Sequence, residues 1–319
     1  NMAKGEQTML FLNRRGYSTF IMCRDCGYVV KCDDCDVSMT YHLSENKLIC
    51  HYCGWQLNPP TQCPECKSLD VGYFGFGTEF IESEVKAKFP NAVVERIDTD
   101  NLSSQKELQE KLDLFRNNKI DILLGTQMVA KGLNFPNLKL VGVIMADTGL
   151  HLPDFRASER TFSLIVQVAG RAGRFFPDGK VIVQSYSPNR SPIYYACKNR
   201  IEEFYDEELQ QRKMLDFPPF SRLIRLVFRS PIKEASELAA NSAAEILESF
   251  REKYNYDDYE ILGPSECPLS KIAANYRNQI ILRSDSIKTI QSVTARFIYN
   301  YKNKQGVYLE VDVDPTNLL

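Results

Sequence analysis

The sequence lacks an uninterrupted apolar run of about 18 or more residues, the length that a membrane-spanning helix requires. Its first residues, Asn1 to Thr8, also lack the basic and then apolar layout of a secretion signal. These absences exclude a membrane-spanning protein and an exported precursor that carries such a signal. We therefore expect a soluble protein of the cytoplasm.

The sequence also has almost no excess of charge of either sign. Its 39 basic and 41 acidic residues give a formal net charge of −2. A strongly basic chain would indicate nucleic-acid binding by charge alone, so any DNA contact must here be local. With 319 residues, 44% of them hydrophobic, the chain is long enough for two or three domains with their own cores.

Two sequences typical of nucleotide hydrolysis are missing. No G-x-x-x-x-G-K-[ST] phosphate loop occurs, because the stretch from Gly173 to Lys180 has one residue too many between its glycines and is followed by Val181. No D-E-x-H sequence occurs either. We therefore expect that this chain alone does not hydrolyse ATP.

Cysteine, by contrast, is present in a pattern that indicates metal. Eight of the ten cysteines form four C-x-x-C pairs, which in a reducing cytosol indicate zinc rather than disulfides. The pairs are Cys23/Cys26, Cys32/Cys35, Cys50/Cys53 and Cys63/Cys66. Two pairs complete a tetrahedral S4 site with no open position. We expect two structural Zn²⁺ ions, whose binding supplies the folding energy of this zinc module (23–66).

The four pairs can be grouped sequentially, crossed or nested. We favour nesting, because the 14 residues between the two inner pairs are close to zinc-ribbon spacing, and this leaves the two outer pairs to meet across the base. Redox-active dithiols are the competing interpretation. His42 and His51 are candidate ligands in principle, but cysteine already fills each site. Cys197 and Cys267 stand alone and are interpreted as half-buried thiols.

Outside the zinc module, apolar runs alternate with helical patterns. Near-continuous apolar runs are typical of buried parallel strands. Such runs occur at 9–13, 73–76, 121–126, 140–147 and 180–186. Helical patterns occupy 78–89, 103–115 and a stretch that starts near Ala157. Because the first run precedes the cysteines and the others follow them, we expect an α/β domain with a parallel sheet and the zinc module inserted into it.

The segment QVAGRAGR, residues 167–174, closes the last of these helices. Offsets of four and three residues place Gln167, Arg171 and Arg174 on one helical face. Arginine suits a phosphate clamp, because its planar guanidinium stays charged and can stabilise γ-phosphate oxygens in a transition state. A solvated, arginine-rich helix end is the plainer alternative.

The segment GTQMVAKG, residues 125–132, lies at the carboxyl end of an expected strand, where open α/β sheets bind ligands. Thr126 and Gln127 are candidates for hydrogen bonds to a DNA phosphate. Lys131 and Gly132 are candidates for facing a nucleotide.

The last hundred residues indicate a separate unit. After a helical connector (191–219), strands and helices follow in the order β-α-β-β-α-β, which is typical of a ferredoxin-like α+β domain (220–319). On its first strand Ile224, Leu226 and Phe228 alternate with Arg225 and Arg229. This alternation predicts a half-buried sheet with a basic face.

Several segments together resemble one family. They are FLNRRGY (11–17), GTE (77–79), GTQMVAKG (125–132), ADTGLHLPDFRASER (146–160), QVAGRAGR (167–174), FPPFSR (217–222) and DVDP (312–315). With the eight cysteines, they resemble the primosomal replication-restart DNA helicases, the primosomal protein N′ family, over the entire chain. One departure is Asn134, where the family pattern leads us to expect Asp, so a carboxylate contact to the nucleotide is in doubt there.

The resemblance implies the C-terminal portion of a superfamily 2 motor in the bacterial cytoplasm, associated with the nucleoid. Such a motor couples ATP hydrolysis, with Mg²⁺, to 3′→5′ unwinding at stalled or branched forks and to primosome assembly. Residues 1–22 and 67–190 would form its RecA-like second lobe. The first lobe and a fork-binding region are expected to be missing.

The resemblance also implies roles for single residues. Gln167, Arg171 and Arg174 would face the ATP γ-phosphate, and the Thr126 and Gln127 side chains would contact single-stranded DNA. In the C-terminal domain, Arg277 and Gln279 are candidates for binding the acidic tail of the single-stranded-DNA-binding protein, with a solvated strand edge as the alternative. The competing function is a non-catalytic, zinc-stabilised DNA-binding or assembly module. A sister motor such as a branch-migration helicase is disfavoured by the four cysteine pairs.

Overall fold

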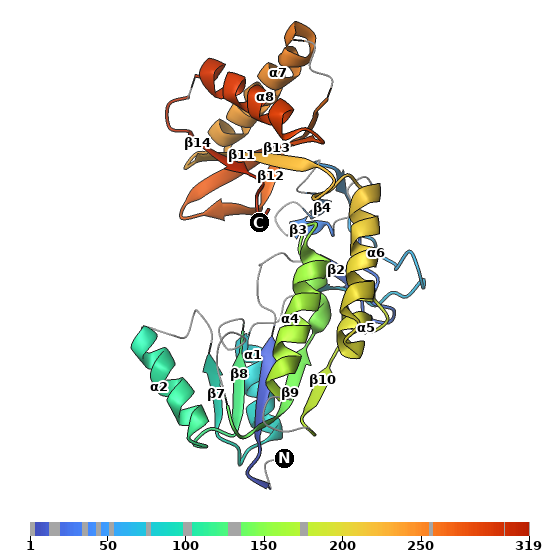
Figure 1. Ribbon diagram of the computed structural model, residues 1–319, viewed down its shortest axis with the longest axis vertical. Coiled ribbons are helices and arrows are strands. Elements are labelled where there is room, and N and C mark those ends of the chain that lie inside the picture. Colours follow the sequence, from blue (N-terminus) through green and yellow to red (C-terminus); the bar gives the residue numbers. More distant parts are fainter. Residues whose placement is uncertain are drawn as a thin grey trace.

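The structure is a computed structural model, and it describes residues 4–12, 20–33, 38–42, 46–50, 54–74, 78–97, 104–126, 135–172, 178–254, 258–302 and 304–318. Along its long axis an α/β lobe, the zinc module and a four-stranded domain follow one another (Figure 1). Among the described helices, none combines the length and the hydropathy that a membrane crossing needs.

A parallel sheet forms the centre of the lobe, with its strands in the order β10-β9-β1-β8-β7. The strands are β1 (Gln7–Leu12), β7 (Val94–Ile97), β8 (Ile122–Gly125), β9 (Leu138–Ile144) and β10 (Lys180–Val183). The parallel α/β lobe was predicted, but β7 was missed. Its short sequence VERI carries two charges, because an edge strand is buried less completely than a central one.

Helices cover both faces of this sheet. On one face α2 (Gln105–Arg116) and α4 (Ala157–Ala172) pack against Met9, Leu123 and Val141 of the strands. On the other face α1 (Thr78–Lys88) packs through Val85. Because the sheet is buried on both sides, its strands have the near-continuous apolar sequence that parallel strands need.

The run at 73–76 was predicted to be a strand of the parallel sheet, and this was wrong. The strand found there, β6 (Val71–Phe74), pairs antiparallel with β2 (Phe20–Cys23) in a separate two-stranded ribbon. The chain enters and leaves the zinc module through this ribbon. A short apolar run does not by itself tell which sheet it joins.

The zinc module contains a three-stranded antiparallel sheet of β3 (Thr40–His42), β4 (Lys47–Ile49) and β5 (Gln56–Leu57). Its buried side chains, including Leu48, share one apolar cluster with Phe217, Leu223 and Ile281 from the C-terminal part of the chain. The module is therefore packed between its neighbours.

Two helices, α5 (Ser191–Lys198) and α6 (Ile201–Met214), connect the lobe to the C-terminal domain. They pack against α4, and the rings of Phe162 and Phe204 stack with their centroids 4.0 Å apart. The connector is therefore attached to the helix that carries Gln167 and Arg171.

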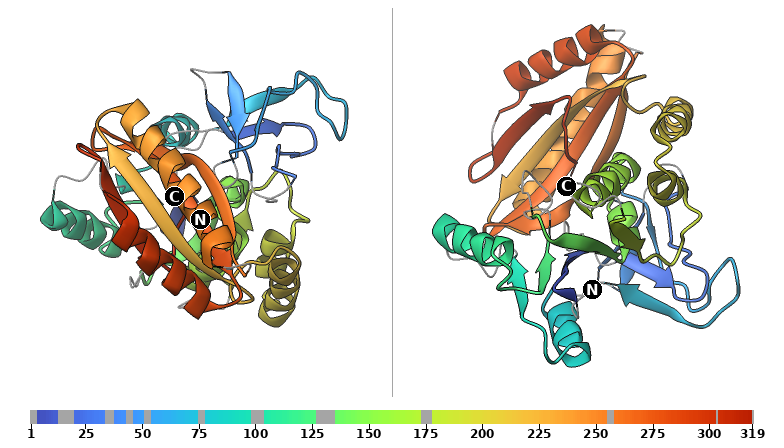
Figure 2. Two further views of the ribbon diagram at one scale, coloured as in Figure 1. Left: turned by 90° about the horizontal axis from the view of Figure 1, so that it is seen from above. Right: turned by 60° about the horizontal axis from the view of Figure 1, so that its bottom comes forward.

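The C-terminal domain has the predicted β-α-β-β-α-β order. Its elements are β11 (Arg222–Ser230), α7 (Lys233–Tyr254), β12 (Glu260–Ile272), β13 (Asn275–Ser284), α8 (Ile287–Asn300) and β14 (Tyr308–Val313). The antiparallel strand order β12-β13-β11-β14 is that of a ferredoxin-like fold, and both helices lie on one face of the sheet (Figure 2).

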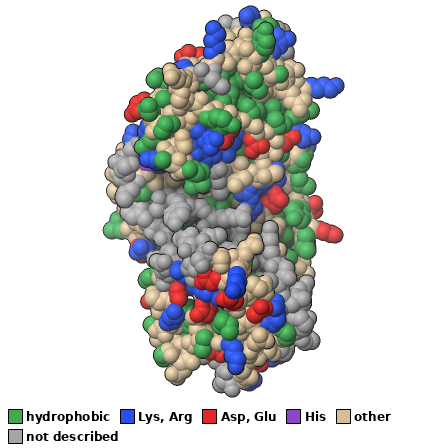
Figure 3. Space-filling view, turned by 90° about the vertical axis from the view of Figure 1, so that its left-hand side faces the viewer, with side chains coloured by type: hydrophobic (Ala, Val, Ile, Leu, Met, Phe, Trp, Pro, Cys, Tyr) green, Lys and Arg blue, Asp and Glu red, His purple; other side chains and the backbone are tan. Residues whose placement is uncertain are grey.

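The predicted basic face of this sheet is wrong. The Arg225 side chain is 4% exposed, and its Nε donates a hydrogen bond to Gln279 Oε1 at 2.6 Å. The face opposite the helices is covered, because it includes Leu223 and Ile281, which pack against the zinc module. Basic and acidic side chains are interspersed on the described surface in Figure 3, as the small net charge leads one to expect.

Candidate functional site

The two outer cysteine pairs meet in space. The sulfurs of Cys23, Cys26, Cys63 and Cys66 all lie within 4.8 Å of one another. The Sγ atoms of Cys23 and Cys66 are 3.6 Å apart, and so are those of Cys26 and Cys63. A tetrahedral zinc site with bonds of about 2.3 Å separates its sulfurs by roughly 3.8 Å, whereas a disulfide needs about 2.05 Å. The geometry therefore fits one closed S4 zinc site.

Local backbone turns aim these sulfurs. The Gly27 N–H donates to the Cys23 carbonyl at 2.9 Å, and the Lys67 N–H donates to the Cys63 carbonyl at 3.1 Å. Both turns require a left-handed residue four positions after the first cysteine, with φ of 76° at Gly27 and 61° at Lys67. Glycine adopts this conformation without strain, whereas lysine does not.

The electrostatics of the cluster favour a bound cation. Burial raises the pKa of Cys23, but hydrogen bonds from the backbone N–H groups of Cys26 and Asp25 outweigh it and lower the pKa to about 7. For Cys26, a backbone hydrogen bond at Tyr28 lowers the pKa, but desolvation and the other three thiols raise it to about 12. Neighbouring thiols therefore oppose ionisation of Cys26, and a metal ion supplies the positive charge that four thiolates need.

The inner pairs are described in part. Cys32 and Cys50 are buried in the same apolar cluster, whereas Cys35 and Cys53 lie outside the described residues. The turn at Cys50 repeats the geometry of the outer pairs, since the Gly54 N–H donates to the Cys50 carbonyl at 2.9 Å. The second zinc site remains a prediction.

The remaining cysteines and histidines correct smaller expectations. Cys197 is exposed and Cys267 is fully buried, so neither is the half-buried thiol that was predicted. His42 lies on β3 and is absent from the four-sulfur cluster, and His51 lies outside the described residues.

The end of α4 presents the expected motif in part. Gln167 is exposed and Arg171 is half-buried on this helix, one turn apart, while Arg174 lies outside the described residues. A Cβ atom at Gly170 would meet no described heavy atom within 4 Å. This part of the helix therefore has room for a ligand or a neighbouring backbone.

Thr126 and Arg171, one candidate DNA residue and one residue of the expected phosphate clamp, lie toward opposite ends of the sheet. Because β9 and β10 are parallel neighbours joined through α4, this helix runs back along the sheet (Figure 1). Its last turn, with Arg171, is therefore near the amino ends of the strands. Thr126 follows the carboxyl end of β8 and is 9% exposed. Gln127, Lys131 and Gly132 lie outside the described residues.

A buried carboxylate at the start of α4 was not singled out from the sequence. Asp154 accepts hydrogen bonds from the Arg156 N–H at 2.8 Å and from the Leu318 N–H at 3.2 Å, and it pairs with Arg160 at 2.9 Å. It therefore joins the first turn of the helix to the end of the chain. Asp ahead of an apolar helical pattern is a helix-start signal that could have drawn attention to it.

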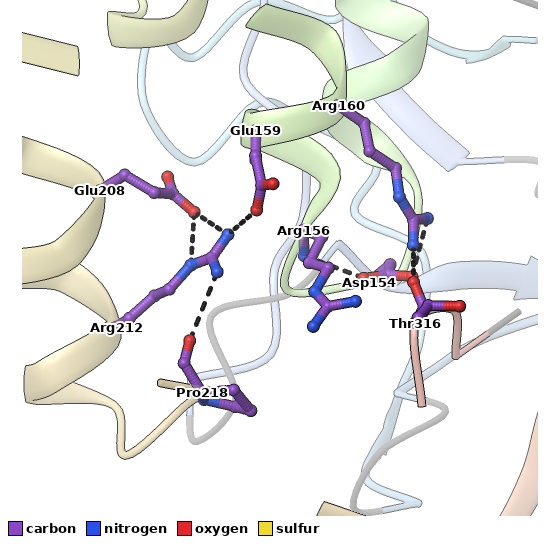
Figure 4. A network of polar contacts seen from close by, with 8 residues as sticks. All are labelled: Asp154, Arg156, Glu159, Arg160, Glu208, Arg212, Pro218 and Thr316. Atoms are coloured by element: carbon purple, nitrogen blue, oxygen red, sulfur yellow. Dashed lines mark hydrogen bonds and ion pairs between the residues drawn. The ribbon is translucent and has the colours of Figure 1, made fainter. Parts of the chain in front are cut away.

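A second group at the same end of α4 centres on Arg212 of the connector (Figure 4). Its guanidinium donates to Glu159 at 2.5 Å, to Glu208 at 2.9 Å and to the Pro218 carbonyl at 3.3 Å. Burial raises the pKa of Glu208, although Arg212 opposes this. These contacts connect α4, α6 and the entry to the C-terminal domain, and sequence spacing could not reveal them because the partners are far apart in the chain.

Arg277 and Gln279, the candidate partner residues, are buried on β13. They are 8% and 1% exposed, and β13 is an inner strand of the sheet. Arg277 donates to the Leu269 carbonyl at 3.2 Å, and Gln279 accepts from Arg225. The alternative of a solvated strand edge is therefore wrong, and the partner role stays a prediction.

Three family models match successive parts of the chain. They are the helicase conserved C-terminal domain over residues 71–176, the PriA DNA helicase Cys-rich region domain over 32–57 and the primosomal protein N C-terminal domain over 213–316. The Cys-rich match spans both inner cysteine pairs and supports zinc binding by this module.

Curated relatives match along nearly the whole chain. The replication restart protein PriA of Treponema pallidum is 48% identical over 99% of this chain, that of Borreliella burgdorferi 41% over 98%, and that of Bacillus subtilis 42% over 98%. The chain spans 47%, 46% and 39% of those proteins, respectively. The three models thus match the helicase lobe, the Cys-rich module and the C-terminal domain that the structure shows. The chain therefore belongs to the PriA family of replication restart proteins and corresponds to their C-terminal portion.

Proposed function

We propose that this chain is the C-terminal part of an ATP-dependent 3′→5′ DNA helicase of superfamily 2. It acts at stalled or branched forks to restart replication and to assemble the primosome, in the bacterial cytoplasm at the nucleoid. The observation that carries the proposal is 48% identity to a replication restart protein over 99% of the chain. The face of α4 that carries the exposed Gln167 and the half-buried Arg171 supports it, because side chains that meet a companion lobe must be accessible in this chain.

In this function the end of α4 stabilises the γ-phosphate of ATP. Gln167, Arg171 and Arg174 approach it from this lobe, with Lys131 and Gly132 near the nucleotide and Mg²⁺ held by the companion lobe. Thr126 and Gln127 contact single-stranded DNA from the opposite end of the sheet. The lobe then lies between its two ligands, and a change in its position on ATP hydrolysis moves the DNA contact.

The zinc module holds two structural zinc ions in this proposal. Cys23, Cys26, Cys63 and Cys66 bind one, and their sulfur spacing supports this. Cys32, Cys35, Cys50 and Cys53 bind the other. Closed S4 sites leave no position for water, so the ions stabilise the fold and do no hydrolytic chemistry.

The partners are single-stranded and forked DNA, other primosome proteins and the acidic tail of the single-stranded-DNA-binding protein. Arg277 and Gln279 are the proposed tail contacts. Because both are buried, the tail must reach Arg277 by replacing its bond to the Leu269 carbonyl. An Arg277→Ala variant that still binds the tail peptide with unchanged affinity would remove this assignment.

The deciding experiment uses the protein with its companion lobe present. Arg171→Ala and Arg174→Ala should each lower DNA-stimulated ATP turnover on the order of a thousand-fold, the effect of losing an arginine finger, with DNA binding retained. Arg116→Ala is the matched control, because Arg116 also lies in the last turn of a lobe helix, on α2. The DNA-stimulated ATP turnover of the Arg116→Ala variant should equal that of the wild type.

The same measurement tests the competing function, a non-catalytic DNA-binding or assembly module. Unchanged turnover in both the Arg171→Ala and the Arg174→Ala variants would support that module and end the motor assignment. The 319-residue chain by itself should show no DNA-stimulated ATP hydrolysis, since it contains no phosphate loop.

A further inference from the structure

A cavity of about 260 Å³ lies where the lobe, the connector and the C-terminal domain meet. Its charged lining residues are Arg156, Arg212, Arg222 and Asp314, and its apolar wall is made mainly of prolines. Three segments that carry the family resemblance and have no part in the zinc or nucleotide sites converge on it. They are ADTGLHLPDFRASER (146–160), FPPFSR (217–222) and DVDP (312–315).

Two of the three arginines already have carboxylate partners. Arg212 is held by Glu159 and Glu208, as Figure 4 shows. Arg222 pairs with Asp314 at 3.1 Å. The Arg156 guanidinium has no carboxylate within ion-pair distance among the described residues. It lies over the Phe155 ring, with its Cζ atom 5.0 Å from the ring centroid. The Arg156 guanidinium therefore has no ion-pair partner of its own in the described part of the chain, although Glu159, Glu208 and Asp314 together balance the charges of the three arginines.

The backbone of Arg156 is held in place. Its N–H donates to Asp154, whose side chain is fully buried and is fixed in turn by Arg160 and by the Leu318 N–H. In Figure 4 the dashed line from Arg156 to this carboxylate starts at the backbone N–H and not at the guanidinium. Because the backbone is fixed and the guanidinium lies over a ring, the side chain loses less conformational entropy when it contacts a ligand.

We infer that Arg156 binds a phosphate of the nucleic-acid backbone in this cavity. A phosphodiester brings one negative charge between two apolar sugar faces, which matches one free guanidinium beside a proline wall. A planar guanidinium donates two parallel hydrogen bonds to such a phosphate.

This inference rests on the proposed DNA function, and it adds a DNA contact at the junction between the lobe and the C-terminal domain. A strand bound there would touch both units at once. Because the contact is to a phosphate, it positions the DNA and does not read its sequence.

The test measures binding of the 319-residue chain to a fluorescent forked oligonucleotide by anisotropy, between 50 and 300 mM salt. Arg156→Ala should reduce the slope of log K against log salt by about 0.9, which amounts to about eightfold in affinity at 0.1 M salt. Arg156→Lys should keep the slope, because it keeps the charge. Arg200→Ala is the matched control, since Arg200 also lies over a ring, that of Tyr195, but is paired with Glu203.

The outcomes separate the two proposals. A wild-type slope in Arg156→Ala, with the fork still bound, would overturn the phosphate site and leave the DNA function standing. A wild-type chain that does not bind the fork at any of these salt concentrations would also overturn the phosphate site, whereas the helicase function is tested separately, by ATP turnover with the companion lobe present. An equal loss in Arg156→Ala and Arg200→Ala would assign the effect to general charge and also overturn the site. Zinc content and circular dichroism confirm that each variant is folded. If the alanine variant is not, Arg156→Gln carries the test, because it removes the charge but keeps most of the side chain, and it should lower the slope by the same amount.

Discussion

The zinc module and the C-terminal domain are both well packed, but their cores come from different sources. The apolar cluster of the C-terminal domain consists entirely of its own residues, between Ile224 and Val307. The cluster of the zinc module includes Leu223, Ile281 and Leu318 from elsewhere in the chain. A segment of this size buries too little surface to fold alone and needs metal and neighbours. We expect the C-terminal domain to fold without the metal, because its main cluster is its own.

The largest effect should come from removing the metal. Chelation removes an apparent binding energy of roughly 10–16 kcal/mol for a structural zinc in small peptides. Hydrogen exchange should then show loss of amide protection in β3, β4 and β5, while β11 and β13 remain protected. Metal analysis should find two zinc ions per chain, and one after Cys63→Ser combined with Cys66→Ser. Equal loss of protection in both regions would show that the C-terminal domain depends on the metal too.

Two neighbouring isoleucines of β13 sharpen the comparison. Ile280 and Ile281 are both fully buried, but Ile280 belongs to the core of the C-terminal domain and Ile281 to that of the zinc module. Each change to alanine should cost about 2–5 kcal/mol. Ile280→Ala should lower the unfolding midpoint of the C-terminal domain, and Ile281→Ala should speed zinc release to a chelator. The comparison fails if both variants release zinc at the same rate.

Acid should destabilise the side of the zinc module that faces the lobe. His151 is 1% exposed beside Phe20 and Ser38, and burial lowers its pKa to about 3 from 6.5. Between pH 6.5 and pH 3 the His151 imidazole is therefore protonated in the unfolded chain but neutral in the folded one. The free energy of unfolding that is present above pH 6.5 falls in this range by about 1.4 kcal/mol per pH unit.

His151→Asn serves as the comparison for this acid effect, because it keeps every zinc ligand. Denaturant titrations between pH 7 and 5 should show a shallower pH dependence in the variant. The C-terminal domain contains no histidine, so its hydrogen exchange should follow pH equally in both proteins. An identical pH dependence of stability in wild type and variant would exclude His151 as the cause.

The smallest effect should come from the first turn of α8. The Ser286 side chain accepts a hydrogen bond from the Thr289 N–H at 3.3 Å and caps the helix. Ser286→Ala should cost about 1 kcal/mol. Because this helix belongs to the self-contained domain, zinc content and the rate of zinc release should stay at wild-type values.

Some of the fold could be predicted because it depends on local rules. The parallel lobe follows from near-continuous apolar runs such as Ile122–Gly125, and the ferredoxin-like order follows from alternating strand and helix patterns. The pairing of Val71–Phe74 and the burial of Arg225 could not be predicted this way. Both depend on which surface covers a strand, and that surface belongs to a distant segment.

The sequence by itself predicted the ligand chemistry of this protein. Paired cysteines indicate zinc and the QVAGRAGR segment indicates phosphate, because these side chains have few other uses at such spacing. The spacing of the cysteines also favoured the meeting of the two outer pairs, which the structure confirms, whereas only the tertiary structure decided which arginine is left without a carboxylate. Those outcomes depend on neighbours up to about half the chain away, such as Leu318 beside Asp154, and distances of this kind are set when the units pack together.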